Sequence, residues 1–266
     1  MSETGSDFPP HKVVILAAGK GTRMKPPGTS EQELDPKVLI PFLEGNLIGS
    51  VLEAIDLSII KSTPVIVVGF KADQVMDTLG RDRYNFVRQE KQLGTGHAVA
   101  SAVEAVRDSV FTLVLYGDMP LIDAATINRI IEAHMDRLPA ITMATVTVPN
   151  FEDEYAGFND FGRVIRDNAG NVVDIVERKN ATPEQLGIKT VNPSIFCFDT
   201  AWLIKNIGGL TDKNKQGEFL LTDMVKLAAS QGKTVSVVDI APEVTFGVNT
   251  PEQLTHAQDV AKSSTA

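Results

Sequence analysis

Several features that mark specialised classes of protein are scarce or absent in this sequence. There is one cysteine, Cys197, so the chain cannot form an internal disulfide, and a reducing compartment, the cytoplasm, is expected. No apolar run approaches the roughly 20 residues of a membrane-spanning helix. Basic residues number 25 against 34 acidic ones, and the net charge of -9 disfavours binding to nucleic acid or to an anionic membrane. With 43% hydrophobic residues, the chain has the composition of an ordinary globular protein.

Apolar runs bounded by turn residues predict six strands. The runs are KVVILA (12–17), PVIVVGF (64–70), FTLVLYGD (111–118), AITMATVTV (140–148), SIFCF (194–198) and TVSVVDI (234–240). They are nearly continuous, which is typical of strands covered on both faces of a sheet. Segments with helical spacing lie between the first runs, for example Leu47, Val51 and Ile55. This alternation predicts an α/β fold with a Rossmann-like, doubly wound, mostly parallel mixed sheet.

A single domain is expected over residues 12–266, after a polar and flexible N-terminal tail over residues 1–11. FGRVIRD and NVVDIVERK flank the turn residues NAG (168–170), which predicts a β-hairpin inserted at about residues 155–180. TAWLIKNI and EFLLTDMVKLAASQG are predicted helices. The pentapeptide TPEQL begins at Thr182 and again at Thr250, and its residues are those of a capped helix start, so it predicts two helices rather than a repeat.

The stretch LAAGKGTRM, residues 16–24, follows the first predicted strand, where glycines allow backbone N–H groups to approach a phosphate. It does not match the dinucleotide fingerprint GxGxxG, because Met24 stands at the third glycine position, and the Walker pattern is absent. Basic residues are concentrated here: Lys20, Arg23, Lys25 and Lys37. In an acidic protein this concentration favours polyphosphate binding over a solvated basic face.

A carboxylate, Asp118, directly follows the predicted strand FTLVLYGD. Ligands of open α/β sheets bind at the carboxyl ends of the strands, so Asp118 and the glycine loop are expected at the same edge. A carboxylate in that position suits Mg²⁺, which takes oxygen ligands and completes its shell with water and phosphate oxygens. Asp118 could instead cap the turn into MPLI, but the cationic loop beside it favours the metal.

An ordered series of motifs resembles one known family. The motifs are LAAGKGTRM with PKVL, RQEKQLGTGHAV, LYGDMPLI, FGRVIRD, IVERK, VN, QGEFLLTD and FGVN. Together they are similar to the uridyltransferase half of N-acetylglucosamine-1-phosphate uridyltransferase, over nearly all of residues 12–255. The resemblance implies the nucleotide-diphospho-sugar transferase fold, with the hairpin over the sugar site. It does not extend to that family's hexapeptide-repeat acetyltransferase half, so a free-standing uridyltransferase is expected.

The resemblance also implies roles for particular residues. Arg23 and Lys37 correspond to catalytic cations that contact phosphate, and Asp118 and Asn249 to the ligands of a Mg²⁺ cofactor. The uracil reader corresponds to Gln89, whose amide can both donate and accept. The other implied substrate-binding residues are Leu16, Ala17, Ala18, Gly19, Gly94, Thr95, Tyr116 and Gly117 on the nucleotide side, and Gly162, Glu177 and Asn192 on the sugar side.

The implied reaction joins UTP and a sugar 1-phosphate, in the first place N-acetylglucosamine 1-phosphate, to give a UDP-sugar and pyrophosphate. The sugar phosphate oxygen attacks the α-phosphorus in line, and because this oxygen is already anionic, no general base is required. Cations and alignment are then expected to supply the catalysis. His97, next to the implied base loop, is expected to be structural rather than catalytic.

The chain departs from the family pattern in four places. The segment between Met24 and Lys37 is longer than usual, and VNPS replaces Asn-Thr-Gly. NDF, at 159–161, stands where Thr, Gly and Tyr are common, and Arg178 stands where His is frequent. The last three changes fall near the implied sugar site, so glucose or another hexose 1-phosphate stays open.

Three other functions also stay open. One is a sugar nucleotidyltransferase that uses a different base, and another is a non-catalytic module that senses nucleotide sugars. The third, a dinucleotide-dependent oxidoreductase, is disfavoured by Met24. The oligomeric state is not predicted from the sequence.

Overall fold

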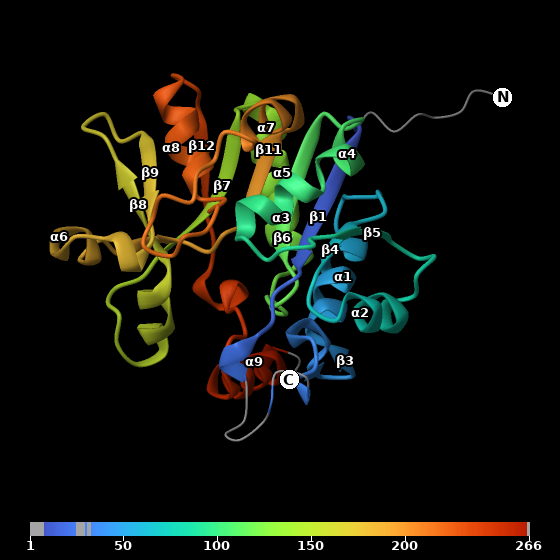
Figure 1. Ribbon diagram of the computed structural model, residues 1–266. Helices are drawn as coiled ribbons and strands as arrows, with labels where there is room; N and C mark the ends of the chain where they lie inside the picture. The colour runs from blue at the N-terminus through green and yellow to red at the C-terminus, as the bar shows by residue number, and fades with distance from the viewer. Residues whose placement is uncertain (1–7, 25–29, 31–32, 265–266) are drawn as a thin grey trace.

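A ten-stranded sheet forms the centre of the protein in the computed structural model, which describes residues 8–24, 30 and 33–264 (Figure 1). The strand order is β5-β4-β1-β6-β11-β7-β10-β8-β9, and β12 pairs with β7. The strands are β1 (His11–Ala17), β4 (Val65–Val68), β5 (Asn85–Arg88), β6 (Phe111–Tyr116), β7 (Ile141–Thr147), β8 (Gly162–Arg166), β9 (Val172–Val176), β10 (Thr190–Asn192), β11 (Phe196–Asp199) and β12 (Val235–Asp239). Because only β9, β10 and β11 run against the rest of this sheet, it is mixed but mostly parallel, which confirms the predicted fold class.

The six strands predicted from apolar runs are all present, with ends that differ from the prediction by about two residues. The sequence did not predict β5 or β10. These strands have four and three residues, and neither contains a continuous apolar run. A separate two-stranded ribbon joins β2 (Pro41–Phe42) to β3 (Gly45–Asn46).

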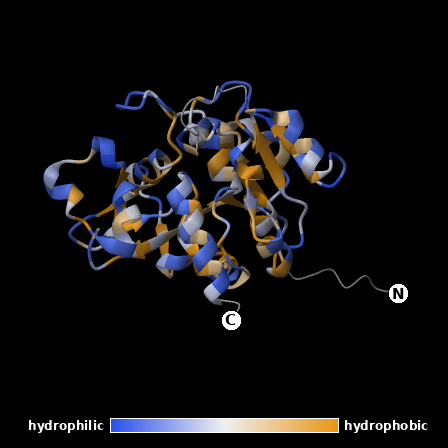
Figure 2. Cartoon of the chain, turned by 90° about the horizontal axis from the view of Figure 1, so that it is seen from below, coloured by the Kyte–Doolittle hydropathy of each residue, from blue (hydrophilic) through white to orange (hydrophobic). Residues whose placement is uncertain are grey.

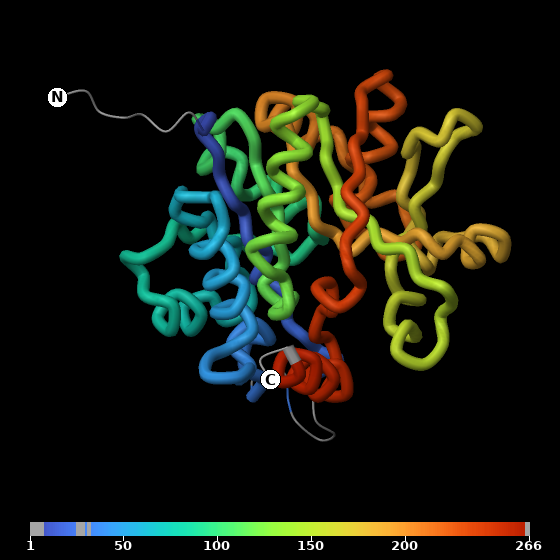
Figure 3. Tube along the Cα trace, turned by 180° about the vertical axis from the view of Figure 1, so that it is seen from behind, coloured from blue at the N-terminus to red at the C-terminus, as the bar shows by residue number. Residues whose placement is uncertain are grey.

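Helices cover both faces of the sheet, as the side chains of β1 require. Val13, Ile15 and Ala17 pack into one apolar cluster with α1, α2 and α5, while Val14 and Leu16 pack into another with α3, α7 and α8. Figure 3 shows α1 and α5 in front of the strands, and Figure 1 shows α3 and α7 on the opposite face. The helices are α1 (Leu47–Leu57), α2 (Ala72–Leu79), α3 (Thr95–Ser101), α4 (Val103–Val106), α5 (Ala124–Arg137), α6 (Pro183–Leu186), α7 (Thr200–Ile207), α8 (Asp223–Ser230) and α9 (Pro251–Ser264).

The distribution of hydropathy agrees with this layered arrangement. In Figure 2 the central strands are mostly orange, and the outer turns of the helices are largely blue. Cys197 lies fully buried in β11, and burial raises the pKa of its thiol, so it behaves as a core residue. None of the helices in the described ranges has the length and apolar composition required to cross a bilayer.

The predicted hairpin consists of β8 and β9, which pair antiparallel and extend the sheet at the end opposite β5. It joins the sheet through β10. β10 and β11 both pair with β7 and are separated by Pro193, Ser194 and Ile195, and Ser194 has a φ of 66°. Proline has no N–H to donate to the ladder, and a residue with left-handed φ turns the chain. The extended segment formed by β10 and β11 is therefore interrupted between β10, which pairs with β8 of the hairpin, and β11, which pairs with β6.

One predicted helix is shorter than expected. α8 begins at Asp223, so the preceding EFLLT is not helical. Phe219 instead pairs with the loop before α3, since its N–H donates to the Leu93 carbonyl and its carbonyl accepts from Gly96, both at 2.8 Å. Helical periodicity cannot predict this long-range pairing. The pairing provides hydrogen-bonding partners for the Phe219 N–H and carbonyl, which a helix would otherwise provide.

Both TPEQL segments start helices. Thr182 and Gln185 form a reciprocal capping box on α6, and the Gln253 N–H donates to Thr250 Oγ1 at the start of α9. Residues 1–7 of the N-terminal segment lie outside the described residues. Phe8 packs against the ring of Phe111 at a centroid distance of 6.0 Å.

His134 in α5 is a buried titratable group whose protonation should affect stability. It is 1% exposed, and its Nδ1 lies 3.0 Å from Thr142 Oγ1. Burial lowers the pKa of His134 from 6.5 to about 4. The unfolded chain therefore binds this proton more tightly, so the contribution to stability is present above about pH 6.5 and is lost as the pH falls towards 4.

We expect acidification from pH 7 to pH 4 to cost the protein about 3 kcal/mol through His134 alone. Urea unfolding at both pH values checks this against His134→Leu/Thr142→Val, which removes both hydrogen-bonding partners. Carboxylates titrate in both proteins, so the difference between the two proteins isolates His134. Equal losses of stability would contradict the assignment.

Candidate active site

Two adjoining cavities lie at the carboxyl ends of β1, β5 and β6. The first has a volume of about 310 Å³ and is lined by Leu16, Ala17, Ala18, Gly19, Lys37, Val38, Gln89, Gln92, Gly94, Thr95, Ala98, Tyr116, Asp118, Glu218 and Asn249. The second has a volume of about 200 Å³ and is lined by Tyr116, Asp118, Met119, Asp160, Phe161, Gly162, Glu177, Asn192, Pro193, Ser194, Thr245, Gly247 and Asn249. Tyr116, Asp118 and Asn249 belong to both, so they form the junction between the cavities.

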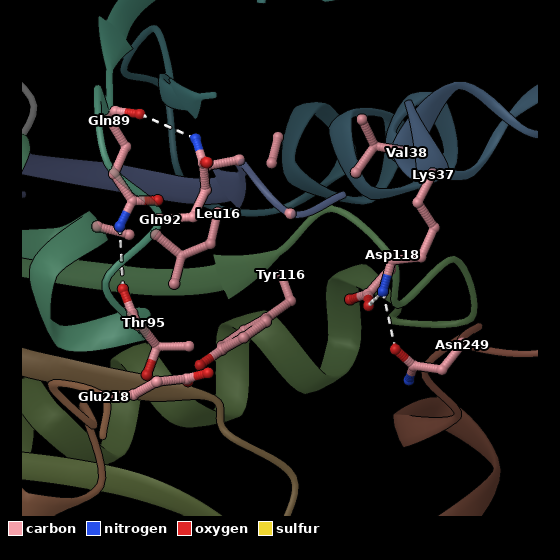
Figure 4. A pocket seen from close by; sticks show the side chains of 15 residues that line it. Leu16, Lys37, Val38, Gln89, Gln92, Thr95, Tyr116, Asp118, Glu218 and Asn249 are labelled. Carbon is pink, nitrogen blue, oxygen red and sulfur yellow. Dashed lines mark hydrogen bonds and ion pairs between the residues drawn. The ribbon is translucent and has the colours of Figure 1, made fainter. Parts of the chain in front are cut away.

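Four predicted residues meet at this junction, and we call them the junction cluster: Arg23, Lys37, Asp118 and Asn249. The Lys37 ammonium forms an ion pair with Asp118 and donates to Asn249 Oδ1 at 2.8 Å. Arg23 donates to the same Asn249 oxygen at 3.0 Å. In Figure 4, Lys37 points towards Asp118 and Asn249 on one side of the first cavity, and Gln89 and Thr95 lie on the other.

The glycine loop and the segment around Lys37 are held close together. Gly21 has a φ of 65°, and a Cβ there would lie 2.6 Å from Lys37 Cβ, so only glycine allows this approach. Lys37 begins a short 3-10 helix, Lys37–Leu39. The side chains of Lys37 and Asp118 are 12% and 14% exposed, so their charges interact with little screening by solvent.

The helix cap of α9 positions Asn249. Gln253 Oε1 accepts from the Asn249 backbone N–H at 2.8 Å, and the Val248 N–H donates to the Asp118 carbonyl at the same distance. The chain before α9 is therefore tied both to its own first turn and to the loop after β6. As a result, Asn249, although 212 residues from Lys37, reaches it with a side-chain oxygen.

Gln89 lies on the far side of the first cavity and is 3% exposed. Its backbone N–H donates to the Val68 carbonyl at 2.8 Å, which continues the β4–β5 ladder by one residue. Gln92 Nε2 donates to the Gln89 carbonyl at 3.2 Å. Gln92 therefore braces the loop that carries Gln89.

Tyr116 stands between the cavities as the last residue of β6 and pairs with Leu16 across the ladder. Burial raises the pKa of its phenol, so the hydroxyl remains protonated at neutral pH. Gly117 lies outside both cavities, because the direction of its missing side chain points at Val38 and Ile48 in the core. Because Gly117 packs tightly against the core, the chain turns there, and Asp118 comes to lie in both cavities.

The second cavity has an acidic and hydrogen-bonding wall. Burial raises the pKa of Glu177, although Thr222 Oγ1 donates to its Oε1 at 2.9 Å and opposes the shift. Asn192 is 2% exposed and ties together the strand interruption, since its Oδ1 accepts from the Ser194 N–H at 2.8 Å and its Nδ2 donates to the Ala144 carbonyl at 3.3 Å.

Arg163, which is fully buried, supports another wall of the second cavity from behind. Its guanidinium donates to the carbonyls of Asn159 and Phe161, donates to Asn159 Oδ1 at 2.7 Å, and lies 4.5 Å from the ring centre of Phe151. In front of this wall, Asp160 forms an ion pair with Arg178. Segment 159–161 is thus fixed on both sides.

Three of the four departures from the family pattern meet at this second cavity. Asp160, Phe161, Pro193 and Ser194 line it, and Arg178 pairs with Asp160. The fourth departure falls mostly on residues 25–29 and 31–32, which lie outside the described residues. Lys25 of the basic window lies there too.

The oxygen pair of the junction cluster suits a small, hard cation. Asp118 Oδ2 and Asn249 Oδ1 both accept from the Lys37 ammonium, so the two oxygens converge on Lys37 Nζ, and a metal ion bound between them would take the place of that nitrogen. Within the described residues there is no group of three or more His, Cys, Asp or Glu that could hold a metal by itself. Mg²⁺ commonly binds to one or two protein oxygens plus substrate phosphates and water, and this donor set fits that pattern.

Residues 13–230 match the family described as MobA-like NTP transferase domain. The chain belongs to this family. The relationship inferred from the motif order is confirmed, and the protein is a nucleotidyltransferase of the sugar nucleotidyltransferase type.

Curated relatives and one solved structure extend this comparison. The chain is 37% identical over 244 residues to the bifunctional protein GlmU of Psychrobacter sp. (strain PRwf-1), covering 91% of this chain and 49% of that protein. It is 38% identical over 256 residues to the bifunctional protein GlmU of Ralstonia nicotianae, covering 96% and 52%. The chain thus spans about half the length of these relatives.

A CMP:2-keto-3-deoxy-manno-octonic acid synthetase, solved in complex with CTP, superimposes with a TM-score of 0.67 at 15% identity, covering 96% of this chain and 99% of that one. At this identity the likeness shows the fold alone.

Several cavity residues of this MobA-like NTP transferase were not predicted. Gln92 lies inside the motif QLGTGHA and Glu218 inside QGEFLLTD, so position within a matched motif was the signal that could have found them. In the second cavity, Met119 lies inside LYGDMPLI and Gly247 inside FGVN, so the same signal was available for them, whereas Thr245 lies outside the matched motifs. Thr245 is fully buried at the end of a short 3-10 helix, Pro242–Thr245, and its hydroxyl donates to the Pro242 carbonyl at 2.8 Å.

Proposed function

We propose that this protein joins UTP to a sugar 1-phosphate and releases pyrophosphate, with Mg²⁺ as cofactor and N-acetylglucosamine 1-phosphate as the first candidate sugar. The observation that supports this most is the junction cluster, which places two cations and two oxygen ligands where the two cavities meet. A nucleotide in the first cavity and a sugar phosphate in the second would bring their phosphates together at this junction.

The chain's own cations suit this reaction. Two polyanions repel one another, and negative charge grows on the departing pyrophosphate, so positive charge held in place lowers the barrier. Lys37 is held by two hydrogen-bonding partners, and Arg23 approaches the same Asn249 oxygen from the exposed side. Binding in adjacent cavities would also align the attacking oxygen with the α-phosphorus.

When bound at Asp118 and Asn249, Mg²⁺ would neutralise charge on the triphosphate. The loop of Leu16, Ala17, Ala18 and Gly19 offers backbone groups to the nucleotide along the first cavity. Gly162, Glu177 and Asn192 offer polar contacts to the sugar in the second.

The decisive experiment measures pyrophosphate release over a grid of nucleoside triphosphates and sugar 1-phosphates with Mg²⁺, and identifies the nucleotide sugar by chromatography. We expect turnover with UTP, and we expect the second substrate to be the 1-phosphate of a hexose that carries no other charged group. Turnover with another triphosphate would reassign the base. Binding of the substrates without turnover of any pair would favour a non-catalytic sensor.

Asp118→Asn should raise the Mg²⁺ concentration needed for half-maximal activity by about tenfold, because an amide oxygen binds the ion more weakly than a carboxylate. A Mg²⁺ titration at saturating substrates measures this. Asp160→Asn is the matched control, since it removes a carboxylate from the second cavity without touching Lys37. If both variants titrate like the parent protein, another residue holds the ion.

A further inference from the structure

The side-chain amide of Gln89 uses both of its hydrogens within the protein. Gln89 Nε2 donates to the Gly94 carbonyl at 3.0 Å and lies 3.0 Å from His97 Nδ1. A glutamine amide carries two hydrogens and one oxygen, so only Oε1 is left for a ligand. In Figure 4 this oxygen faces the interior of the first cavity, on the side of Leu16 and Tyr116.

The orientation of this amide is fixed by its two partners. The Gly94 carbonyl can only accept, so the nitrogen of Gln89 must face it, and His97 Nδ1 must accept as well, with the ring proton on Nε2. Turning the amide by 180° would place Oε1 against the Gly94 carbonyl, and also against the Nδ1 lone pair of His97 unless the ring proton moved from Nε2 to Nδ1. Because Gln89 is 3% exposed, water has little access to compensate for these lost bonds.

We propose that His97 is a positioning residue for base selection, which locks the Gln89 amide with its oxygen towards the cavity so that uracil is accepted and cytosine rejected. The proposal rests on the proposed nucleotide site. It gives a role to a residue that lines neither cavity and that the sequence indicated only as structural.

The selectivity follows from what each base presents. At ring position 3 uracil carries an N–H, which can donate to Gln89 Oε1, whereas cytosine carries a lone pair, which that oxygen repels. At position 4 uracil has an oxygen and cytosine an amino group, so the two bases are reversed at both positions. A freely turning amide could serve either base, but a locked amide serves one, because the wrong base leaves buried polar groups unpaired.

Three substitutions at His97 separate its hydrogen bond to Gln89 from a role in packing alone. His97→Phe keeps a ring beside Phe219, whose centroid lies 6.4 Å from that of His97, but removes the acceptor. His97→Asn removes the ring but can place Oδ1 where Nδ1 stood. His97→Leu provides a second variant without an acceptor should the first fail to fold, and thermal melts report folding.

The measured quantity is the ratio of kcat/KM for UTP to that for CTP. In His97→Phe this ratio should fall by at least about tenfold, mainly through a higher KM for UTP and a lower KM for CTP. His97→Asn should stay within about threefold of the parent ratio. In a Gln89→Leu background, His97→Phe should change the ratio by less than about twofold, because the locked group is gone.

An unchanged ratio in a folded His97→Phe protein would overturn the proposal, as would an equal loss in His97→Phe and His97→Asn. Calorimetric binding of UDP and CDP with Mg²⁺ gives the same comparison without turnover. Failure of the proposed function looks different, because the parent protein itself would then show no turnover of UTP with any sugar 1-phosphate.

Discussion

Replacing Lys37 with alanine should lower kcat by about two orders of magnitude, which corresponds to about 3 kcal/mol of transition-state stabilisation. The ammonium lies at the junction of the two cavities and contacts Asp118 and Asn249. Its loss removes a positive charge from the place where phosphates would meet. It also leaves the Asp118 carboxylate, 14% exposed, without its lysine partner, so less positive charge faces the triphosphate.

Steady-state kinetics with UTP varied at saturating Mg²⁺ and sugar phosphate distinguishes this effect from weaker binding. A group that acts mainly in the transition state lowers kcat and kcat/KM together, whereas loss of ground-state contacts raises KM alone. Lys205→Ala, on the exposed side of α7, removes the same charge far from the cavities and should leave kcat unchanged. Normal turnover by a folded Lys37→Ala protein would remove Lys37 from the mechanism.

Much of the fold was predictable because it depends on the local pattern of apolar residues along the sequence. Alternating Val13, Val14, Ile15 and Leu16 form a strand that buries both faces, and this alone requires helices on each side of the sheet. Strands that run parallel end at the same edge, so the ligand edge follows from the order of the elements. Asp118 reaches that edge because it follows β6, whereas Lys37, in a 3-10 helix, comes beside it through its close packing on Gly21.

The remaining parts depend on contacts between distant segments, which no local pattern encodes. EFLLT has apolar residues suited to a helix, but Phe219 pairs with the loop before α3 instead. The orientation of Gln89 depends on a carbonyl and an imidazole that the fold brings beside it. The amide was expected to donate and accept towards the base, and the structure leaves only its oxygen for this purpose.

The departures from the family pattern that meet at the second cavity also depend on contacts between segments that are distant in the sequence. Asp160 and Arg178 are 18 residues apart and meet only because the hairpin folds back, and Pro193 reaches the same cavity from the interrupted strand. In the sequence, these residues were three separate departures from the family pattern. Together they form one altered wall, so the first cavity keeps the family pattern while the second departs from it.

Gly94→Ala is expected to have the largest effect on stability of any single methyl addition in the first cavity. Gly94 has a φ of 113°, a conformation that alanine rarely adopts, and a Cβ there would lie 2.6 Å from the Phe219 carbonyl oxygen and 2.9 Å from its nitrogen. Both are backbone atoms held by hydrogen bonds to the neighbouring loop, so they cannot move aside easily. Strain and overlap together should cost about 3 kcal/mol.

The same substitution should disturb nucleotide binding, because the Gly94 carbonyl holds the Gln89 amide and Thr95 lines the same cavity. We expect the melting temperature to fall by about 6 to 10 °C and the KM for UTP to rise at least about tenfold.

Two control variants separate the effect of backbone strain from that of the close approach to Phe219. Gly208→Ala adds a methyl in open space at ordinary φ and should be nearly neutral, while Gly217→Ala, at a φ of 66° with no atom within 4 Å, reports strain alone. If Gly94→Ala is no worse than Gly217→Ala, the close approach of Phe219 does not constrain the loop that carries Gly94.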